Sequence, residues 1–538
     1  MRDYSLDQVE AVIDHAYVKV FNRLRKYNRR DLVRYALGHY EVTRTPAFRM
    51  GLYDPGVNEE AIDFLLGNLN GGLTYLVRWL MTSKGRKPIR SLTELETSEF
   101  FNLLQLAVAY SYANIYFTQT RRGSHSCRID GKNRRIIFSI INNGDLAFKH
   151  YSSTVNGLIL EDDLRIRESL DLFTTPNILA MKSRAPTLFH ASERVDVQPF
   201  IKQILAYLQR TALIELDSDE SLGEYTKEEF LLLYSVWIAV ARYDVALQHA
   251  PKGAPMERFN PYPFESSYGL LSTSFSRLTG LDKVKVNAIL QDFIFNSSKG
   301  SRRLSVKPIV KIDGIAMWSS SYVLRPYAGI IFSNLVYKDR KNDYDRLQEK
   351  LENHAVKSLT QEIEDLSSGD LKLVDVSVVL KSKTQLTPYI VFINSKDNSI
   401  LIVEYKYFIS AYGYEDVSSQ FKSIGKAIKQ LEQYVNLPFL DHLRPYGVIV
   451  SHHTVASPVP AIPTDGTSLL SRRMLLDIVE RTALPDRIIN FARSLHDLAH
   501  TRVKHKQIGS IGEWSIDHPI LTGDFPIPSY SERLSSVV

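Results

Sequence analysis

The stretch Ile400-Leu-Ile-Val-Glu404-Tyr-Lys406 decides how the C-terminal half of this chain is interpreted. Its apolar residues predict a buried strand, and the strand ends in Glu-x-Lys. Side chains two residues apart on a strand share a face, so Glu404 and Lys406 are expected to project together from its end. A carboxylate beside an ammonium group can hold a divalent metal ion and polarise a phosphate or a water. The chemistry that this pattern favours is phosphodiester cleavage.

The segments around this strand predict a helix, three strands, a second helix and a further strand. Hydrophobic spacing and turn residues place them at 344–367, 371–380, 389–394, 399–406, 416–434 and 446–451. A turn at 394–398 joins the second and third strands, and this register sets Glu404 opposite Tyr389. In the second helix, Gln430 and Tyr434 are four residues apart and therefore share a face.

This order and these motifs resemble the PD-(D/E)XK, or restriction-endonuclease-like, nuclease superfamily over residues 300–451. Glu404-Tyr-Lys406 matches the family's Glu-x-Lys, and Gln430 to Tyr434 matches the Gln-x-x-x-Tyr of one branch. Glu352 matches a glutamate often found on the first helix. The resemblance implies a Mg²⁺ or Mn²⁺ site with Glu404, Asp375 and Glu352 as ligands. It implies a catalytic set of Glu404, Lys406, Glu352, Gln430, Asp375 and Tyr434.

The family's aspartate on the second strand has no counterpart at the expected place, because Tyr389 stands there. Asp375 is the formal alternative. If a simple loop at 381–387 joins its strand to the next, Asp375 lies nearer residue 393 than residue 389. That offset of four residues is about 13 Å at the rise of a strand. A longer loop or a bulge would bring Asp375 closer to Glu404.

Each of these residues also has a structural reading. A Glu-x-Lys at a strand end is commonly a solvated ion pair. Gln430 and Tyr434 can be a surface amide and a ring packed under a helix, and Glu352 can lie on the exposed face of its helix. An intact site with the aspartate supplied elsewhere and a degenerate site are both compatible with the sequence.

Composition bounds the class of protein. The length of 538 residues fits about three or four folded domains. The chain is 44% hydrophobic and 23% charged, and its formal net charge is +6. The single cysteine, Cys127, excludes an intrachain disulfide, and no signal-peptide pattern is present, so we expect a cytoplasmic protein. The longest apolar run, from Phe230 to Ala241, is too short to span a bilayer. We therefore expect a buried helix there and no membrane partner.

The fold class expected is α+β and multidomain, with a large helical N-terminal region before the nuclease-like unit. Four parts are expected: 1–150 mainly helical with a basic β-hairpin, 151–300 helical, 301–455 nuclease-like, and 456–538 C-terminal helices and tail. The nuclease-like part begins with a hairpin over 307–319. The C-terminal helices are expected at 468–482 and 485–499, followed by a basic tail.

Basic residues gather in three places. Six cations within fifteen residues, opposed only by Asp130, are the best candidates for contacts with nucleic-acid phosphates: Arg121, Arg122, Arg128, Lys132, Arg134 and Arg135. A second cluster is a solvated helix face or a DNA contact: Arg23, Arg25, Lys26, Arg29, Arg30 and Arg34. A third, weaker group is Arg502, Lys504 and Lys506.

Three functions are compatible with the sequence, and the third is a structural subunit that does not contact nucleic acid. The first is a metal-dependent nuclease acting on DNA, whose helical region senses or positions the substrate; the resemblance implies a role in bacterial or mobile-element defence against phage. The second is a catalytically inactive nuclease fold that binds nucleic acid or assembles with a protein partner or with copies of itself. A basic chain fits RNA as well as DNA.

Overall fold

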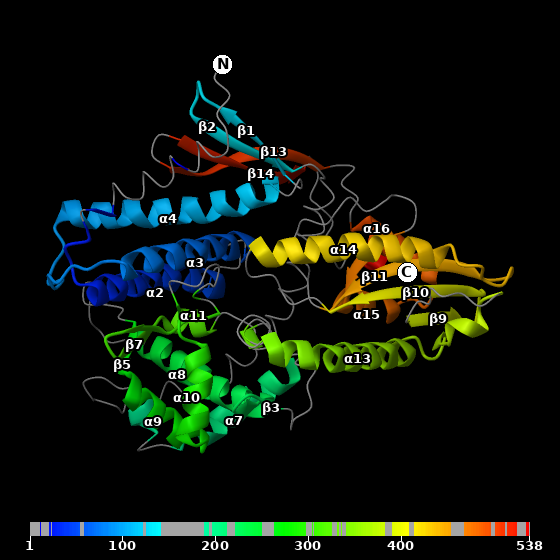
Figure 1. Ribbon diagram of the computed structural model, residues 1–538, viewed down its shortest axis with the longest axis horizontal. Helices are drawn as coiled ribbons and strands as arrows, with labels where there is room; N and C mark the ends of the chain where they lie inside the picture. The colour runs from blue at the N-terminus through cyan, green and yellow to red at the C-terminus, as the bar shows by residue number, and fades with distance from the viewer. Residues whose placement is uncertain are drawn as a thin grey trace.

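The computed structural model is a mixed α/β protein, and its described residues form four separate sheets. It describes residues 11, 21–22, 24–53, 59–121, 125–140, 188–192, 196–211, 221–249, 263–296, 304, 306–324, 331–332, 335, 341–381, 390–407, 414–452, 467–495, 501–511, 514–523 and 534–536. Figure 1 shows the α2–α4 helices beside one sheet, a second helical group below them, and an α/β unit at the other end.

The α/β unit is built on a five-stranded sheet with the order β12-β11-β10-β9-β8. Its strands are β8 Leu371–Leu373, β9 Ile390–Asn394, β10 Ser399–Lys406, β11 Arg444–Ser451 and β12 Thr467–Ser471. Strands β10, β11 and β12 run parallel, whereas β9 is antiparallel to both of its neighbours. The first six residues of β10 are all buried, because helices cover both faces, and this explains the continuous apolar run in the sequence.

Four helices surround this sheet: α13 Lys341–Leu366, α14 Tyr414–Val435, α15 Arg472–Val479 and α16 Pro485–Ser494. In Figure 1, α14 runs along one side of the sheet and α13 along the other. Helix α14 lies very close to β11 at Gly447, where an added Cβ would be 2.7 Å from a methyl carbon of Val435. The missing side chain at Gly447 therefore fixes how near α14 approaches the sheet.

The expected elements agree with the structure in this unit except at two strands. The β9–β10 register pairs Ile400 with Ile393, which confirms the predicted hairpin. The strand expected over 371–380 ends at Leu373, because Asp375 caps a 3-10 helix over Val376–Val378. The helix expected from 468 begins only at Arg472, because 467–471 pairs with β11 as a fifth strand and Ser471 caps the helix.

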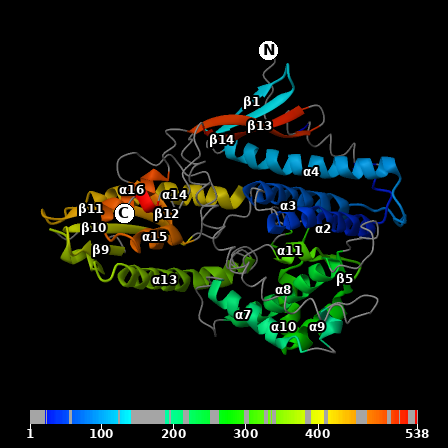
Figure 2. The same cartoon turned by 180° about the vertical axis from the view of Figure 1, so that it is seen from behind.

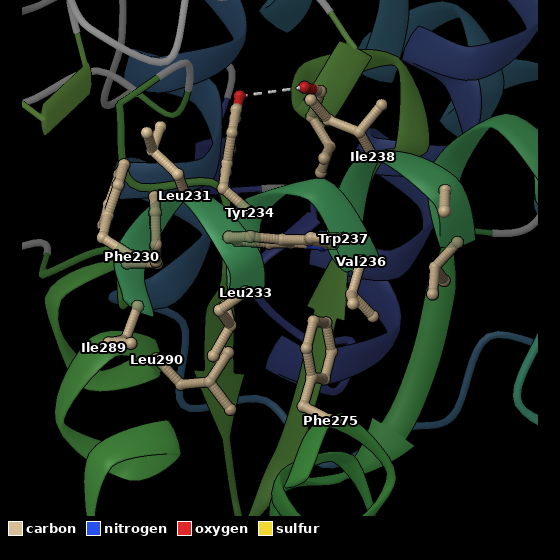
Figure 3. Packing of buried hydrophobic residues seen from close by; sticks show 14 of the residues in the cluster. Phe230, Leu231, Leu233, Tyr234, Val236, Trp237, Ile238, Phe275, Ile289 and Leu290 are labelled. Atoms are coloured by element: carbon tan, nitrogen blue, oxygen red, sulfur yellow. Dashed lines mark hydrogen bonds between the residues drawn. The ribbon is translucent and has the colours of Figure 1, made fainter. Parts of the chain in front are cut away.

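A second region surrounds the apolar helix α8. It comprises α6 Leu188–Ala191, α7 Gln198–Thr211, β3 Ser221–Leu222, β4 Tyr225–Thr226, α8 Lys227–His249, β5 Phe264–Ser267, α9 Tyr268–Thr279, α10 Lys283–Asp292, β6 Val310–Ile312, β7 Ile315–Trp318 and α11 Ser320–Leu324. Figure 3 shows Trp237 of α8 above Phe275, with Ile289 and Leu290 below the helix. The Tyr234 hydroxyl donates to the Val323 carbonyl at 3.1 Å. No helix in the described part of the chain is long and apolar enough to cross a membrane.

The third region combines the two ends of the described chain. It comprises α2 Arg29–Tyr53, α3 Glu59–Met81, α4 Glu94–Arg121, β1 His125–Asp130, β2 Arg135–Ile140, β13 Thr501–Ile511 and β14 Trp514–Gly523. The strands form one sheet in the order β1-β2-β14-β13, visible from both sides in Figures 1 and 2. Its buried Ile136, Phe138 and Ile516 join the core of the α2–α4 helices.

Two expectations about the boundaries of these regions differ from the structure. The hairpin expected at 307–319 forms as β6 and β7, but it pairs with β5 and not with the five-stranded sheet. The basic tail contains a long hairpin, β13–β14, whose second strand pairs with β2. Both differences arise because the strand partners lie far away in the sequence, so local patterns do not reveal them.

Helix α13 links two hydrophobic cores. Its Leu347 and Leu351 belong to the core around Trp237, whereas Leu359 and Ile363 belong to the core of the five-stranded sheet. Successive turns of a single helix are thus buried in two different units.

Candidate functional site

Glu404 and Lys406 lie at the carboxyl end of β10 and contact each other. The Glu404 Oε1 atom is 2.6 Å from the Lys406 Nζ atom, and only 11% of the Glu404 side chain is exposed. The two residues share a face because they are two positions apart on the strand. The expected ion pair at the strand end is therefore present and largely shielded from solvent.

Helix α14 brings two further predicted residues to this pair. Lys406 Nζ donates a hydrogen bond of 3.4 Å to Gln430 Oε1. Tyr434, one helical turn further, is nearly buried, and its pKa is raised first by burial and then by the negative charge of Glu404. Four predicted site residues, Glu404, Lys406, Gln430 and Tyr434, therefore meet between β10 and α14.

Glu352 does not join this group through a described contact. It lies half-buried on α13, on the other side of the sheet from α14 in Figure 1. Its Oε1 atom accepts a hydrogen bond of 3.0 Å from Gln348 Nε2, one turn earlier on the same helix. This is the helix-surface role that the sequence also allowed.

Asp375 lies opposite a different residue of β9 from the one expected. The β8–β9 register pairs Leu373 with Phe392, and the Val374 N–H donates to the Val391 carbonyl at 2.9 Å, which carries Asp375 to the level of Ile390. Ile390 pairs with Val403, so Asp375 is within about a residue of the level of Glu404. The expected offset of four residues was wrong, because β8 ends early and does not continue into a simple loop.

The carboxylate of Asp375 nevertheless caps the 3-10 helix that follows it and is not directed by any described contact to Glu404. It lies two strands from β10, about 10 Å by the spacing of strands. It accepts from the Ser377 N–H at 2.8 Å, and hydrogen bonds from the Ser377 side chain and backbone lower its pKa. Tyr389, which the register sets opposite Glu404, lies outside the described residues.

The described residues do not form a ready metal cage. Within that part of the chain, no three His, Cys, Asp or Glu side chains gather closely enough to hold a metal ion, and this includes the expected set of Glu404, Asp375 and Glu352. One buried carboxylate, Glu404, remains. Mg²⁺ is often held by one or two carboxylates together with substrate phosphates. The donor set therefore fits an ion that shares Glu404 with a bound phosphate.

The opposite face of β10 carries an aromatic cluster that the sequence did not reveal. The Tyr405 hydroxyl is hydrogen-bonded to His452 Nδ1, and the ring of Tyr407 stacks on His452 with centroids 4.5 Å apart. His452 is buried, and its backbone N–H donates to the Lys406 carbonyl at 2.9 Å. The cluster holds the end of β10 against β11 and so fixes the backbone that carries Glu404 and Lys406.

The basic hairpin expected around Asp130 forms as β1 and β2. Arg128, Lys132 and Arg134 are exposed there, whereas Arg135 forms an ion pair with the buried Asp517 of β14. The Asp130 carboxylate shapes the turn by accepting from the N–H groups of Lys132 and Asn133. Arg121 is the last residue of α4, and Arg122 lies outside the described residues.

The cluster between Arg23 and Arg34 has a role that the sequence did not suggest. Lys26 pairs with Glu96 at 2.6 Å and Arg29 with Asp313 at 3.1 Å, while Arg30 and Arg34 both pair with Glu265 of β5. These cations therefore join α2, and the residues just before it, to neighbouring elements. Arg502, Lys504 and Lys506 lie on β13.

No family model matches this chain, and it matches neither a curated protein nor a solved structure. Its function is therefore inferred from its own residues and contacts.

Proposed function

We propose that the unit built on the five-stranded sheet is nuclease-like and acts on the phosphodiesters of DNA. The observation that supports this most is the meeting of Glu404, Lys406, Gln430 and Tyr434 at the carboxyl end of β10. A strand and a helix whose contacting residues, Lys406 and Gln430, are 24 positions apart place an acid, a base, an amide and a hydroxyl together. Helix packing alone does not require that combination.

Each residue has a chemical role in this proposal. Lys406 offsets charge on the scissile phosphate, and Gln430 holds its ammonium group in place through the 3.4 Å hydrogen bond. Glu404 would hold a divalent ion, Mg²⁺ or Mn²⁺, together with phosphate oxygens. Such an ion, when bound, supplies a water of lowered pKa. Because its own pKa is raised, Tyr434 keeps its proton and can donate a hydrogen bond to an anion.

The setting we propose is defence against foreign DNA, with the other regions of the chain positioning the substrate. Its support is the likeness of the nuclease-like sequence motifs to those of defence proteins. The exposed Arg128, Lys132 and Arg134 of the β1–β2 hairpin are cations that suit contacts with a phosphate backbone.

A second candidate function is binding of DNA without cleavage. The observation that favours it is the single buried carboxylate in the described part of the site, since Asp375 caps a 3-10 helix and Glu352 bonds to its own helix. In that case Lys406 and the basic hairpin would contact phosphates, and binding would weaken steeply with salt.

Cleavage assays separate the two candidates. Linear, circular and single-stranded DNA are incubated with Mg²⁺ or Mn²⁺ and with the native chain, Glu404→Gln or Lys406→Met. The matched control is Asp370→Asn/Lys396→Met, which removes an ion pair of 2.5 Å near the other end of β10. The proposal requires cleavage by the native chain and the control, and none by the two site variants.

Equal cleavage by Glu404→Gln and the native chain would overturn the assignment of the site. An absence of cleavage by every protein, together with salt-sensitive DNA binding, would establish the second candidate instead.

A further inference from the structure

Helices α9 and α10 form a helix–turn–helix. They are joined by three residues, Gly280, Leu281 and Asp282. Gly280 adopts a left-handed conformation (φ 75°) and its N–H donates to the Ser276 carbonyl, which ends α9. The Asp282 carboxylate accepts from the Lys285 N–H at 2.9 Å and begins α10. Two helices joined by a short turn that contains glycine are the arrangement that many DNA-binding domains place against a duplex.

The surroundings of this motif are also those of a DNA-binding domain. Helix α8 packs against it, with Trp237 near Phe275 of α9 at 6.4 Å between ring centroids (Figure 3). Strand β5 leads directly into α9 through Ser267, and the β6–β7 hairpin follows α10 and completes the sheet in the order β5-β7-β6. The unit is thus a helix, a strand, the helix–turn–helix and a hairpin, the arrangement of a winged helix.

The outward face of α10 carries side chains that suit base recognition. Val286, Ile289 and Leu290 point into the core, and the exposed stripe consists of Lys283, Val284, Asn287 and Gln291. Val284 is 65% exposed although it is a large apolar residue. Asn and Gln can each bond both edge atoms of an adenine, lysine can bond guanine or a phosphate, and methyl groups can contact the thymine methyl.

The charge of this segment complements DNA. Residues 268–311 contain eight basic and two acidic side chains, a net charge of +6 that equals the formal charge of the whole chain. Both acids are engaged: Asp282 caps α10, and Asp292 accepts from the Tyr225 hydroxyl at 2.6 Å. Among the cations, Lys285 pairs with Glu229 of α8 at 2.5 Å, Arg277 donates to the Phe189 carbonyl at 2.8 Å, and Lys307 is buried. The segment after α10 adds Lys299, Arg302 and Arg303 without an acid.

We propose that α10 is a recognition helix that enters the major groove of duplex DNA. Asn287 and Gln291 read base edges, Lys283 contacts a guanine or a phosphate, and Val284 contacts a thymine methyl. This surface goes beyond the proposed cleavage, because it would select a duplex sequence whether or not Glu404 supports hydrolysis.

The experiment is selection of sequences from a random duplex library by the full chain in EDTA, where cleavage cannot occur. Enriched duplexes are then titrated against the native chain and Lys283→Ala/Asn287→Ala/Gln291→Ala. We expect the native chain to enrich a sequence. We expect the triple variant to bind it about 10–100-fold more weakly, as the loss of base contacts predicts.

The matched control is Lys202→Ala/Gln203→Ala/Gln209→Ala, which removes exposed residues of the same kinds from α7. It should bind as the native chain does. Val284→Glu is a second variant at an exposed position, and it should weaken binding by repelling phosphates. Thermal melts should match for all of these proteins, since no core residue changes.

Equal affinity of the native chain and the triple variant would overturn the proposal, as would binding to single strands alone or no binding to duplexes. Because Glu404→Gln keeps α10 intact, it should select the same sequence as the native chain. A cleavage failure in that variant therefore leaves this result unaffected, and the two proposals can fail separately.

Discussion

Two strand carboxylates in this protein are shielded and ion-paired, yet their surroundings differ. The side chains of Glu404 on β10 and Glu265 on β5 are 11% and 18% exposed. Glu404 pairs with Lys406, two positions along the same strand. Glu265 pairs with Arg30 and Arg34 of α2, and 235 positions separate it from Arg30.

The comparison separates an ion pair that joins two elements from an ion pair that lies within one strand. Arg30 and Glu265 connect two elements, so their interaction adds to tertiary stability. Glu404 and Lys406 already lie on one strand, so their contact adds nothing to the connection between elements. Losing the Glu404–Lys406 contact itself should therefore cost little stability, whereas the Lys406–Gln430 hydrogen bond does join β10 to α14.

The largest expected effect is that of Glu404→Gln on cleavage. We expect a loss of about 10²–10³-fold or more, because the one buried carboxylate of the site is neutralised. The free energy of unfolding should change by no more than about 1 kcal/mol. Initial cleavage rates and urea unfolding measure the two quantities. A large loss of stability with cleavage retained would show that the Glu404–Lys406 pair has the structural role that we assign to the Glu265 pairs.

Next come the residues of α14 that contact this pair. Gln430→Ala and Tyr434→Phe should each lower the cleavage rate about 5–20-fold, the scale of one lost hydrogen bond. Burial and the Glu404 charge raise the pKa of Tyr434 above its usual 10, so its hydroxyl keeps its proton throughout neutral and mildly alkaline pH. Rate profiles from pH 6 to 9 should have the same shape for Tyr434→Phe and the native chain. If the native rate changes at the alkaline end of the profile and the Tyr434→Phe rate does not, Tyr434 is instead the group that titrates.

A smaller effect is expected from Glu265→Gln. It should lower the free energy of unfolding by about 1 kcal/mol, because the two arginines lose their anion but stay partly exposed to solvent. Cleavage per folded molecule should remain unchanged. Urea titration followed by tryptophan fluorescence measures the stability, and Lys381→Met, which removes an ion pair at an exposed surface, is the control. If Glu265→Gln abolishes cleavage and leaves the free energy of unfolding unchanged, the pairing of Glu265 with Arg30 and Arg34 is not structural.

The smallest expected effect is that of Asp375→Ala. It should cost no more than about 1 kcal/mol through the lost cap of a 3-10 helix and should leave cleavage unchanged. Asp375→Asn, which can still cap, should restore the stability. Cleavage that disappears in both variants would show that Asp375 leaves its cap and serves as the missing acid.

The parts of the fold predicted from sequence are those with local causes. The β9–β10 register followed from the turn at 394–398, and the meeting of Glu404 with Lys406 followed from the two-residue repeat of a strand. Gln430 and Tyr434 were singled out by the resemblance to a Gln-x-x-x-Tyr motif, and their four-residue spacing predicted that they share a helix face. These features need only neighbouring residues and a known repeat.

The features that sequence reasoning missed depend on distant partners. The four residues of β5 pair with β7 about fifty positions later, and β14 pairs with β2 from the other end of the chain. The basic residues between Arg23 and Arg34 resembled a solvated helix face or a DNA contact, because Glu265, which pairs with Arg30, lies far away in the sequence. Asp375 was misplaced because a 3-10 helix ended its strand early. Periodicity carries no information about such pairings.

The pairing of β2 with β14 has a consequence for synthesis of the protein. Arg135 and Asp517 are 382 residues apart in the chain, yet they form one ion pair. A ribosome adds about 5–20 residues each second, so β2 waits roughly 20–80 s for its neighbour. During that time the edge of β2 that pairs with β14 has no partner strand and remains open to other chains. Until the last hairpin emerges, this edge is therefore a place where the nascent protein can pair with another chain.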